Sequence, residues 1–344
     1  MRILVVTDAW LPQVNGVVRT YRTLAKMLGE MGHEVVFVTP QDFRTVPCPT
    51  YPEIRLAVLP GRKLGRMIAA AQPAAIHVAT EGPLGLAARR FCLARGLPFT
   101  SSFHTKFPEY VHARSGLPVS WGYAAMRWFH GPSQALMVAT QGVEDELAAW
   151  GLGRIRRWTR GVDTELFRPR DKGFLDLPRP VALYVGRVAV EKNVEAFLAL
   201  DLPGTKLVVG DGPQRAALEK RYPAAVFAGA RAGEDLVAHY AAADVFVFPS
   251  RTDTFGLVLL EALASGLPVA AYPVAGPKDV IGDAPVGVLD DDLGAAARRA
   301  LTIPPEACRA FALERSWRAS AEQFLGNLAP FDTDVAFPKA AGTV

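Results

Sequence analysis

Two carboxylates and a glycine turn stand close together in residues 252–269, which read TDTFGLVLLEALASGLPV. Asp253 precedes a Phe-Gly turn, and Glu261 follows on a short apolar helix, about two turns along it. The amides of Phe255, Gly256 and Leu257 would lie at the start of that helix, where unpaired N–H groups bind phosphate. This pattern suits a ligand with an anionic linker and hydroxyl groups at both ends, such as a nucleotide sugar. A buried amphipathic helix with an acidic N-cap is the alternative without a ligand.

Two cations occur together in GRVAVEKNV, which follows a strand-like run and contains Arg187 and Lys192. A guanidinium fork and an ammonium point charge at one strand end suit a diphosphate. Farther along, VVGDGP places Gly210 and Gly212 in a tight turn, where the backbone can approach a ligand closely. An ordinary exposed basic loop is the alternative here.

Two further candidates lie in the first half of the chain. Gly16 opens a helix in PQVNGVVRT, and its amide could approach an anion, although helices often start with glycine for structural reasons alone. His104 follows a strand in FHTKFPEYV, where a packed or capping histidine is as common as a catalytic one. Their positions at carboxyl ends of strands favour ligand binding.

Two parallel sheets would position these residues. Short Val- and Ile-rich runs alternate with helical patterns, which predicts an α/β protein with a doubly wound, Rossmann-like sheet in each half. The expected strands are 2–7, 35–39, 75–78, 99–102 and 136–139, then 181–186, 206–210, 225–228, 245–249, 268–272 and 287–289. Two such domains with one linker imply a cleft between them, with the ligand at the carboxyl ends of the strands.

The domain boundaries are expected from composition. Residues 164–180, rich in Pro, Arg and Asp, read as the linker. The expected parts are a first domain (1–165), a second domain (166–310), a terminal helix (306–330) that packs back on the first domain, and a loose tail (331–344). Trp317 and Phe324 form an apolar stripe on that helix.

The bulk composition predicts a cytoplasmic protein, soluble or peripheral on a membrane. The chain has 344 residues, half of them apolar, enough for two domains. Cys48, Cys92 and Cys308 are too far apart to predict a disulfide framework or a zinc site. The first residues lead directly into a strand, so no signal peptide is expected, and no run reaches the ~20 apolar residues that span a bilayer.

A mild positive charge and one aromatic segment suggest an anionic partner. The net charge is +4, without a recognisable nucleic-acid motif, so anionic lipid or a phosphorylated ligand fits as well as a solvated basic face. Residues 117–133 combine Trp121, Trp128 and other aromatic side chains with Arg127, which is typical of an interfacial amphipathic helix. The alternative is that these aromatic side chains form core or the wall of an acceptor pocket.

The motifs quoted above occur in one order and cover nearly the whole chain. Together with RGVDTELFRP at residues 160–169, they resemble the retaining GT-B glycosyltransferases of family 4, and within it the bacterial α-mannosyltransferase and glycolipid-synthase branch. The resemblance implies a nucleotide-sugar donor, held by the second domain, and a lipid or glycan acceptor, held by the first.

The resemblance also implies a role for each candidate. Arg187 and Lys192 would hold the donor diphosphate and stabilise the departing nucleotide. Asp253, with the amides of residues 255–257, would hold sugar hydroxyls and phosphate, and Glu261 would bind the ribose. The family usually has Glu at position 253, so the shorter Asp side chain leaves its sugar contacts in question.

In the first domain, Gly16 would contact a phosphate and His104 would lie beside the transferred sugar. No carboxylate is placed as a nucleophile, so retention implies a front-face route in which a donor phosphate oxygen receives the acceptor proton. A metal need not be invoked for this chemistry, and neither a metal nor another cofactor is expected.

The donor and acceptor stay open at this stage. GDP-mannose is the first expectation, with UDP-glucose or UDP-glucuronate and a diacylglycerol acceptor as the alternative. A GT-B sugar-nucleotide epimerase and a non-catalytic nucleotide-sugar or lipid-binding protein are the remaining alternatives. No nucleic-acid partner is expected.

Overall fold

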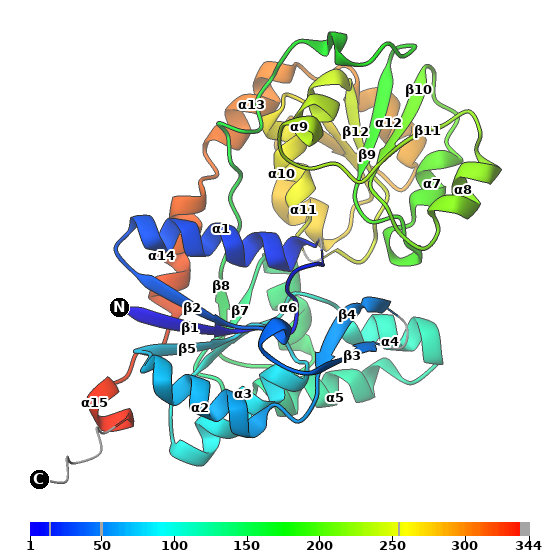
Figure 1. The fold of residues 1–344 in the computed structure, drawn as a ribbon. Coiled ribbons are helices and arrows are strands. Elements are labelled where there is room, and N and C mark those ends of the chain that lie inside the picture. The colour runs from blue at the N-terminus through cyan, green and yellow to red at the C-terminus, as the bar shows by residue number, and fades with distance from the viewer. Residues whose placement is uncertain (14, 49–50, 254, 338–344) are drawn as a thin grey trace, which may run out of the picture. The chain divides into compact units, whose positions relative to one another are not determined.

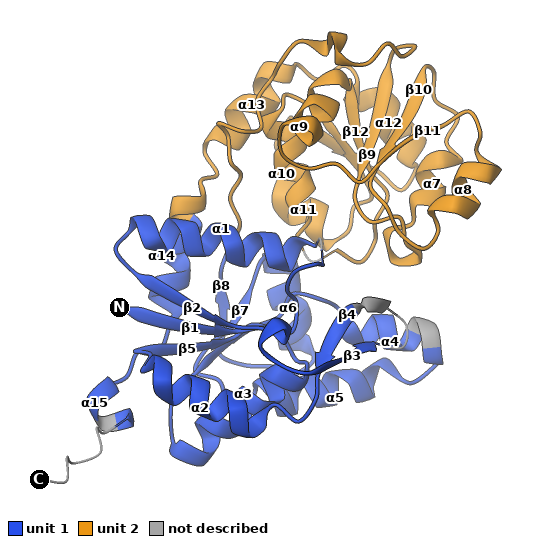
Figure 2. Cartoon of the chain, in the orientation of Figure 1, with its two compact units in different colours: residues 1–159, 320–344 blue, residues 160–319 orange. Residues whose placement is uncertain are grey.

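The computed structural model describes residues 1–13, 15–48, 51–253 and 255–337, which form two compact units (Figures 1 and 2). Unit 1 combines residues 1–159 with the C-terminal segment from Ser320, and unit 2 comprises Arg160–Ala319. The chain therefore leaves unit 1 once and returns to it near its end.

Unit 1 is built on a six-stranded parallel sheet in the order β2-β1-β5-β6-β7-β8 (Figure 1). Its strands are β1 (Arg2–Val6), β2 (Glu34–Val38), β5 (Ala75–Val78), β6 (Thr100–Ser102), β7 (Leu136–Val138) and β8 (Ile155–Arg157). Its helices are α1 (Gly16–Glu30), α2 (Gly61–Ala71), α3 (Pro83–Arg95), α4 (Phe107–Ser115), α5 (Val119–His130), α6 (Gln141–Ala149) and α15 (Thr333–Ala336), with the 3-10 turn η1 (Pro40–Asp42). The five strands expected in this half are confirmed to within one residue at each end.

Helices cover both faces of this sheet because strand side chains alternate between its two sides. Leu4 and Val6 of β1 pack in one apolar cluster with side chains of α2 and α3. Ile3 and Val5 point to the opposite face, where α1 and α14 (Trp317–Asn327) cover them. Unit 1 is thus doubly wound.

Unit 2 repeats this plan with a parallel sheet in the order β11-β10-β9-β12-β13-β14. Its strands are β9 (Val181–Val185), β10 (Thr205–Val209), β11 (Val226–Gly229), β12 (Val245–Phe248), β13 (Val269–Ala271) and β14 (Gly287–Leu289). Its helices are α7 (Val194–Leu198), α8 (Arg215–Arg221), α9 (Gly233–Ala242), α10 (Leu257–Ala264), α11 (Ala275–Ile281), α12 (Leu293–Ala300) and α13 (Pro305–Leu313), with η2 (Lys172–Phe174) and η3 (Val190–Lys192). All six expected strands are confirmed to within one residue.

Two features of unit 1 were not expected from the sequence. An antiparallel hairpin of β3 (Thr45–Cys48) and β4 (Tyr51–Ala57) occupies a region where no strand was expected, and β8 adds an edge strand. Prolines at positions 47 and 52 obscure the hairpin, since proline is rare in strands, and two of the three residues of β8 are arginines.

The C-terminal region also differs from the expectation. Instead of one helix over 306–330, the structure has α13 and α14, separated by residues 314–316. The break has a packing cause, since Cys308 of α13 is buried in the core of unit 2 and Phe324 of α14 in that of unit 1. The expected tail is anchored as far as Phe337: this side chain is buried, and the Phe331 amide donates to Ala74 O at 2.9 Å.

Candidate functional site

The strand order of unit 2 brings its two candidate loops side by side. In a doubly wound sheet, ligands bind where the strand order reverses, outside the carboxyl ends of the strands. That point lies between β9 and β12, which are neighbours in the sheet. The loop with Arg187 and Lys192 follows β9, and the segment with Asp253 follows β12.

Hydrogen bonds join these two loops at their backbones. Asn193 Nδ2 donates to Pro249 O at 3.1 Å, and the Thr252 hydroxyl donates to Glu191 O at 3.2 Å. The Ser250 hydroxyl makes a longer contact with the same Glu191 carbonyl, at 3.4 Å. The two neighbours of Lys192, Glu191 and Asn193, are therefore hydrogen-bonded to the segment that follows β12.

Lys192 and Asp253 form an ion pair, with Lys192 Nζ donating to Asp253 Oδ1. Their side chains are 24% and 17% exposed, so the pair is largely shielded from water. The other carboxylate oxygen, Asp253 Oδ2, is buried and has no hydrogen-bond partner among the described residues. A buried acceptor in this state calls for a donor, and a ligand hydroxyl would supply one.

Tyr184, the fourth residue of β9, supports the loop that carries Arg187. Its hydroxyl donates to Arg187 O at 2.8 Å. Burial, and then the negative charges of Asp253 and Glu191, raise the pKa of Tyr184 well above its ordinary value. The phenol stays neutral and holds the Arg187 backbone in place.

The turn into α10 depends on glycine. Gly256 is the N-cap residue in a left-handed conformation, with φ of +83°, so the amides after it lie at the helix start. A Cβ on Gly276 of α11 would lie 2.8 Å from Asp253 O and 3.1 Å from Phe255 O, so close packing of α11 fixes this turn. The predicted binding of phosphate by the amides of residues 255–257 stays a prediction, and residue 254 lies outside the described residues.

Glu261 is deeper in the helix and almost fully buried, at 4% exposed. Tyr240 of α9 donates its hydroxyl to Glu261 Oε2 at 3.0 Å. The carboxylate thus has a fixed orientation, and its predicted role toward a ribose stays a prediction.

Gly210 and Gly212 serve close packing between two loops. A Cβ on Gly210 would lie 1.8 Å from Gly186 O, and one on Gly212 would lie 2.4 Å from Val188 O. These glycines therefore let the end of β10 approach the Arg187 loop. The close approach predicted from the sequence is made to a neighbouring backbone, and a contact with a ligand stays a prediction.

In unit 1, Gly16 is exposed at the start of α1. The Asn15 side chain caps this helix by accepting from the amides of Val17 and Val18, each at 3.0 Å. An anion at this helix start would therefore bind through the Gly16 amide or displace Asn15.

His104 lies between β6 and α4 and is half-buried. Its Nε2 contacts the hydroxyl of Tyr21, on α1, at 2.9 Å. Tyr21 was missed from the sequence because a fully buried tyrosine looks like an ordinary core residue.

In the unit 1 sheet the strand order reverses between β1 and β5, and Asp8 follows β1 at this point. Asp8 was also missed from the sequence. Its carboxylate accepts from the amides of Leu84 and Gly85, at 2.9 and 3.2 Å, and from the Thr80 hydroxyl at 2.9 Å. Burial raises its pKa to about 6 although these hydrogen bonds lower it. A Cβ on Gly82 would lie 2.4 Å from its carboxyl carbon, so glycine is required there. Asp8 fastens the start of α3 to the end of β1.

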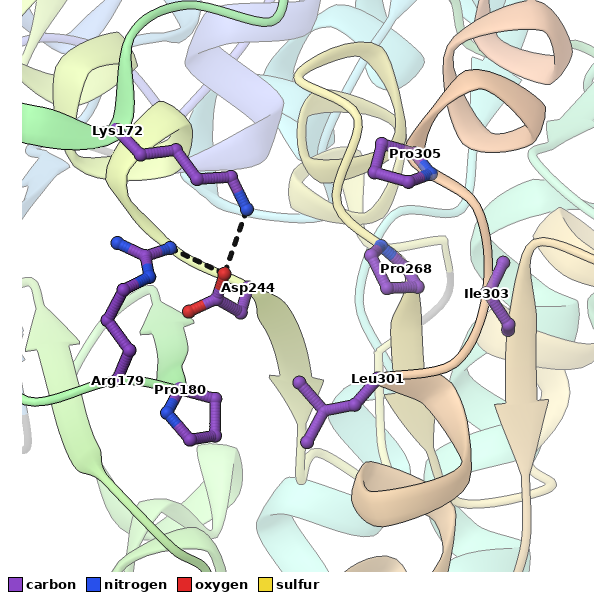
Figure 3. A pocket seen from close by; sticks show the side chains of 8 residues that line it. All are labelled: Lys172, Arg179, Pro180, Asp244, Pro268, Leu301, Ile303 and Pro305. Atoms are coloured by element: carbon purple, nitrogen blue, oxygen red, sulfur yellow. Dashed lines mark hydrogen bonds and ion pairs between the residues drawn. The ribbon is translucent and has the colours of Figure 1, made fainter.

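A cavity of about 430 Å³ lies in unit 2 beside the amino ends of its sheet strands, whereas the Lys192–Asp253 pair follows the carboxyl ends (Figure 3). It is lined by Lys172, Arg179, Pro180, Asp244, Pro268, Leu301, Ile303 and Pro305. Asp244 accepts from Lys172 Nζ at 2.8 Å, from Arg179, and from the Val181 amide at 2.8 Å. These groups pair with one another at the amino ends of β9 and β12, so they brace the sheet.

The aromatic segment divides between core and surface. Tyr123 and Phe129 of α5 are buried, which matches the core interpretation for those side chains. Trp121 and Trp128 are 67% and 55% exposed on the same helix. Neighbouring α4 and the loop before α5 add exposed Phe107, Val111 and Leu117.

Within residues 1–13, 15–48, 51–253 and 255–337, no group of three or more His, Cys, Asp or Glu side chains is arranged to hold a metal ion. Of the helices described, none has the length and hydrophobicity to cross a membrane.

Comparison with known proteins adds to this geometry. Residues 14–166 match the family described as Glycosyltransferase Family 4, and residues 179–304 match that described as Glycosyl transferases group 1. The GDP-mannose-dependent alpha-mannosyltransferase of Mycobacterium tuberculosis is 30% identical over 95% of this chain and 96% of its own. The alpha-monoglucosyldiacylglycerol synthase of Streptococcus pneumoniae is 29% identical over 94% of this chain and 83% of its own.

Among solved structures, a sucrose-phosphate synthase from Thermosynechococcus elongatus has a TM-score of 0.78 and 23% identity, over 94% of this chain and 97% of that one. Identity at this level supports the fold alone. The expected GT-B fold, with its two Rossmann-like parallel sheets, is thereby confirmed.

Proposed function

Because this chain belongs to glycosyltransferase family 4, we propose that it transfers mannose from GDP-mannose to a lipid or glycan acceptor, with retention of the anomeric configuration. At a coarser level, the chain is a glycosyltransferase that uses a nucleotide sugar. Its family membership decides against the epimerase and the non-catalytic binding protein that the sequence left open.

The observation that carries the proposal is the Lys192–Asp253 pair with its buried Asp253 Oδ2, which has no hydrogen-bond partner in the part of the chain that the structure describes. Breaking the anomeric C–O bond develops negative charge on the diphosphate, and cations fixed beside that charge lower the barrier. In the proposal, Arg187 and Lys192 meet the diphosphate, and Asp253 Oδ2 accepts from a sugar hydroxyl. Glu261 receives the ribose, with the helix-start amides of α10 near the phosphates.

Retention is proposed through a front-face route. No carboxylate nucleophile is assigned. In this route the C–O bond to the diphosphate breaks, the acceptor oxygen bonds to the anomeric carbon on the same face, and a donor phosphate oxygen receives the acceptor proton. His104 of unit 1 is assigned to the sugar, and Gly16 to a phosphate, on the resemblance alone.

The test of the site is turnover of Lys192→Ala, measured as GDP release from GDP-mannose. We expect a loss of two orders of magnitude or more, since a fixed transition-state charge contributes about 3–4 kcal/mol. Arg221→Ala, which removes an exposed cation of unit 2, is the control. Near-normal release by Lys192→Ala would refute the assignment.

The identity of the donor is tested by thermal stability with GDP, UDP, ADP and CDP. A nucleotide at 100 times its dissociation constant adds about 2.7 kcal/mol of stability. Selective stabilisation by GDP supports mannose as the sugar, and selectivity for UDP favours the glucosyl or glucuronosyl alternative.

The acceptor is proposed to be a lipid at an anionic membrane. The exposed side chains of α4 and α5, above all Trp121, form an apolar face of the kind that inserts at a membrane interface. Co-sedimentation with phosphatidylglycerol vesicles should fall in Trp121→Ser and stay unchanged in Phe174→Ser, which removes an equally apolar, exposed side chain from unit 2. Absence of binding by the unmodified protein at low salt would remove the membrane from the proposal.

A further inference from the structure

Buried polar residues of β5 and β6 are connected to His104 by a hydrogen-bond network that passes through Tyr21 of α1. We propose that Tyr21 and His77 are positioning residues, which hold the His104 ring and set which of its nitrogens carries a proton. The inference rests on the proposed role of His104 beside the transferred sugar.

Each residue of this network contacts the next one directly. The Tyr21 hydroxyl lies 2.9 Å from His104 Nε2 and also 2.9 Å from His77 Nε2. His77 Nδ1 contacts Thr100 Oγ1 at 2.8 Å, and Ser102 Oγ contacts His77 Nε2 at 3.0 Å. Both Tyr21 and His77 are fully buried.

These contacts explain an unusual strand. A central strand of a parallel sheet, buried on both faces, is normally apolar, yet β6 reads Thr-Ser-Ser and is entirely buried. Thr100 and Ser102 point to one face, where both meet His77, and Ser101 on the other face contacts His130 Nδ1 at 2.9 Å. Each hydroxyl thus has an imidazole partner, as buried polar groups require.

Ring packing holds the same geometry. The ring of Tyr21 meets that of His104 edge-on, with centroids 5.4 Å apart. Trp158 lies 5.6 Å from the Tyr21 ring and 5.9 Å from the His104 ring. His104 therefore adjoins the rigid core of unit 1 although it follows the strand in a loop.

The proton count couples the two histidines. Tyr21 has one hydroxyl proton and two imidazole nitrogens beside it, so at least one of the two Nε2 atoms must carry a proton of its own. The hydrogen bond with Tyr21 engages Nε2 of His104, and the same hydroxyl engages Nε2 of His77. The state of Nδ1 of His104 then follows from the direction of hydrogen bonding through Tyr21.

The first experiment is long-range ¹H–¹⁵N NMR of the full chain labelled with ¹⁵N-histidine. The chain has only six histidines, and His104→Ala and His77→Gln identify the two ring signals of interest. Tyr21→Phe should change the nitrogen shifts of His77 and His104 and leave the other four unchanged. Tyr123→Phe, which removes another buried tyrosine hydroxyl, should leave both rings unchanged. Unaltered His77 and His104 signals in Tyr21→Phe would overturn the proposal.

A second experiment separates this proposal from the role of His104. GDP release from GDP-mannose should show about tenfold lower kcat in Tyr21→Phe, with KM changed less than twofold, because the lost hydrogen bond orients the ring. A normal kcat in Tyr21→Phe, together with a strong loss in His104→Ala, would overturn the positioning role. Normal turnover in His104→Ala together with the expected NMR change would instead reject the proposed role of His104 and leave the coupling of the two rings intact.

Discussion

Replacing Asp253 by Asn should make the protein bind GDP more tightly while it transfers sugar more slowly. Lys192 is engaged by Asp253 in an ion pair, so a diphosphate must compete with this carboxylate for the ammonium group. Asn keeps the shape of the side chain and removes its charge. The substitution therefore removes the carboxylate charge that competes with the diphosphate for Lys192.

The size of the effect follows from the burial of the pair. Two unit charges 4 Å apart attract by about 4 kcal/mol at an effective dielectric constant of 20. Removing such a pair from water offsets much of this attraction, and both side chains retain some exposure. A net release of about 1.4 kcal/mol corresponds to about tenfold tighter binding of GDP.

Titration calorimetry with GDP and with GDP-mannose would measure both sides of this argument. The affinity for GDP should rise about tenfold, whereas that for GDP-mannose should rise less because the variant loses an acceptor for the sugar. Glu195→Gln is the control, since it removes one charge from the same unit at a side chain that pairs with Arg221. Equal or weaker GDP binding by Asp253→Asn would refute the reasoning.

Three further outcomes are expected. Asn193→Gly should lower the free energy of unfolding by about 1 kcal/mol, because the hydrogen bond to Pro249 O is lost. Asn193→Ala should lower it by about 1 kcal/mol more, because residue 193 has a φ of +53°, which alanine disfavours. Urea unfolding would contradict this prediction if the Ala variant were more stable than the Gly variant. Gly276→Ala should weaken GDP binding in calorimetry by moving the turn at Asp253, and unchanged affinity would contradict the packing argument. The raised pKa of Asp8 means that its contribution to stability is fully present below pH 3.8 and is lost as pH rises through about 6. From pH 7 to pH 5, the free energy of unfolding of the wild type should therefore rise by about 1 kcal/mol relative to that of Asp8→Asn. Equal slopes of stability against pH in the two proteins would contradict this prediction.

The sheets could be predicted from the sequence because buried parallel strands are short apolar runs, such as Val181–Val185, separated by helical patterns. Strand β8 could not, since its arginines lie on an edge where burial does not select apolar side chains. The break between α13 and α14 was missed for a different reason: the apolar stripe continues through it, and only the two separate cores show where the helix must end.

The strand-end positions of Arg187, Lys192 and Asp253 could be predicted from the sequence because strand ends are local features, and the roles of these residues stay predictions. The residues that support them could not be predicted. Tyr184 and Tyr21 look like ordinary core residues, and only the tertiary structure shows what their hydroxyls contact. Asn193 did carry a usable signal, since Asn tolerates the left-handed conformation that a turn after Lys192 requires.

The return of the chain to unit 1 has a consequence for the order of folding during synthesis. Phe324 packs against Trp158, with ring centroids 4.8 Å apart, and Ser320 accepts from the Trp158 indole at 3.1 Å. A ribosome makes these partners long after Trp158, when all of unit 2 has already been synthesised. Unit 2, although second in sequence, is thus the first unit whose residues have all been synthesised. Until α14 is made, the face of the unit 1 sheet that α1 and α14 cover together stays partly exposed. A chain that stops at Ala319 should accordingly bind a hydrophobic dye at unit 1, and a chain without such exposure would show that the sheet closes without its last helix.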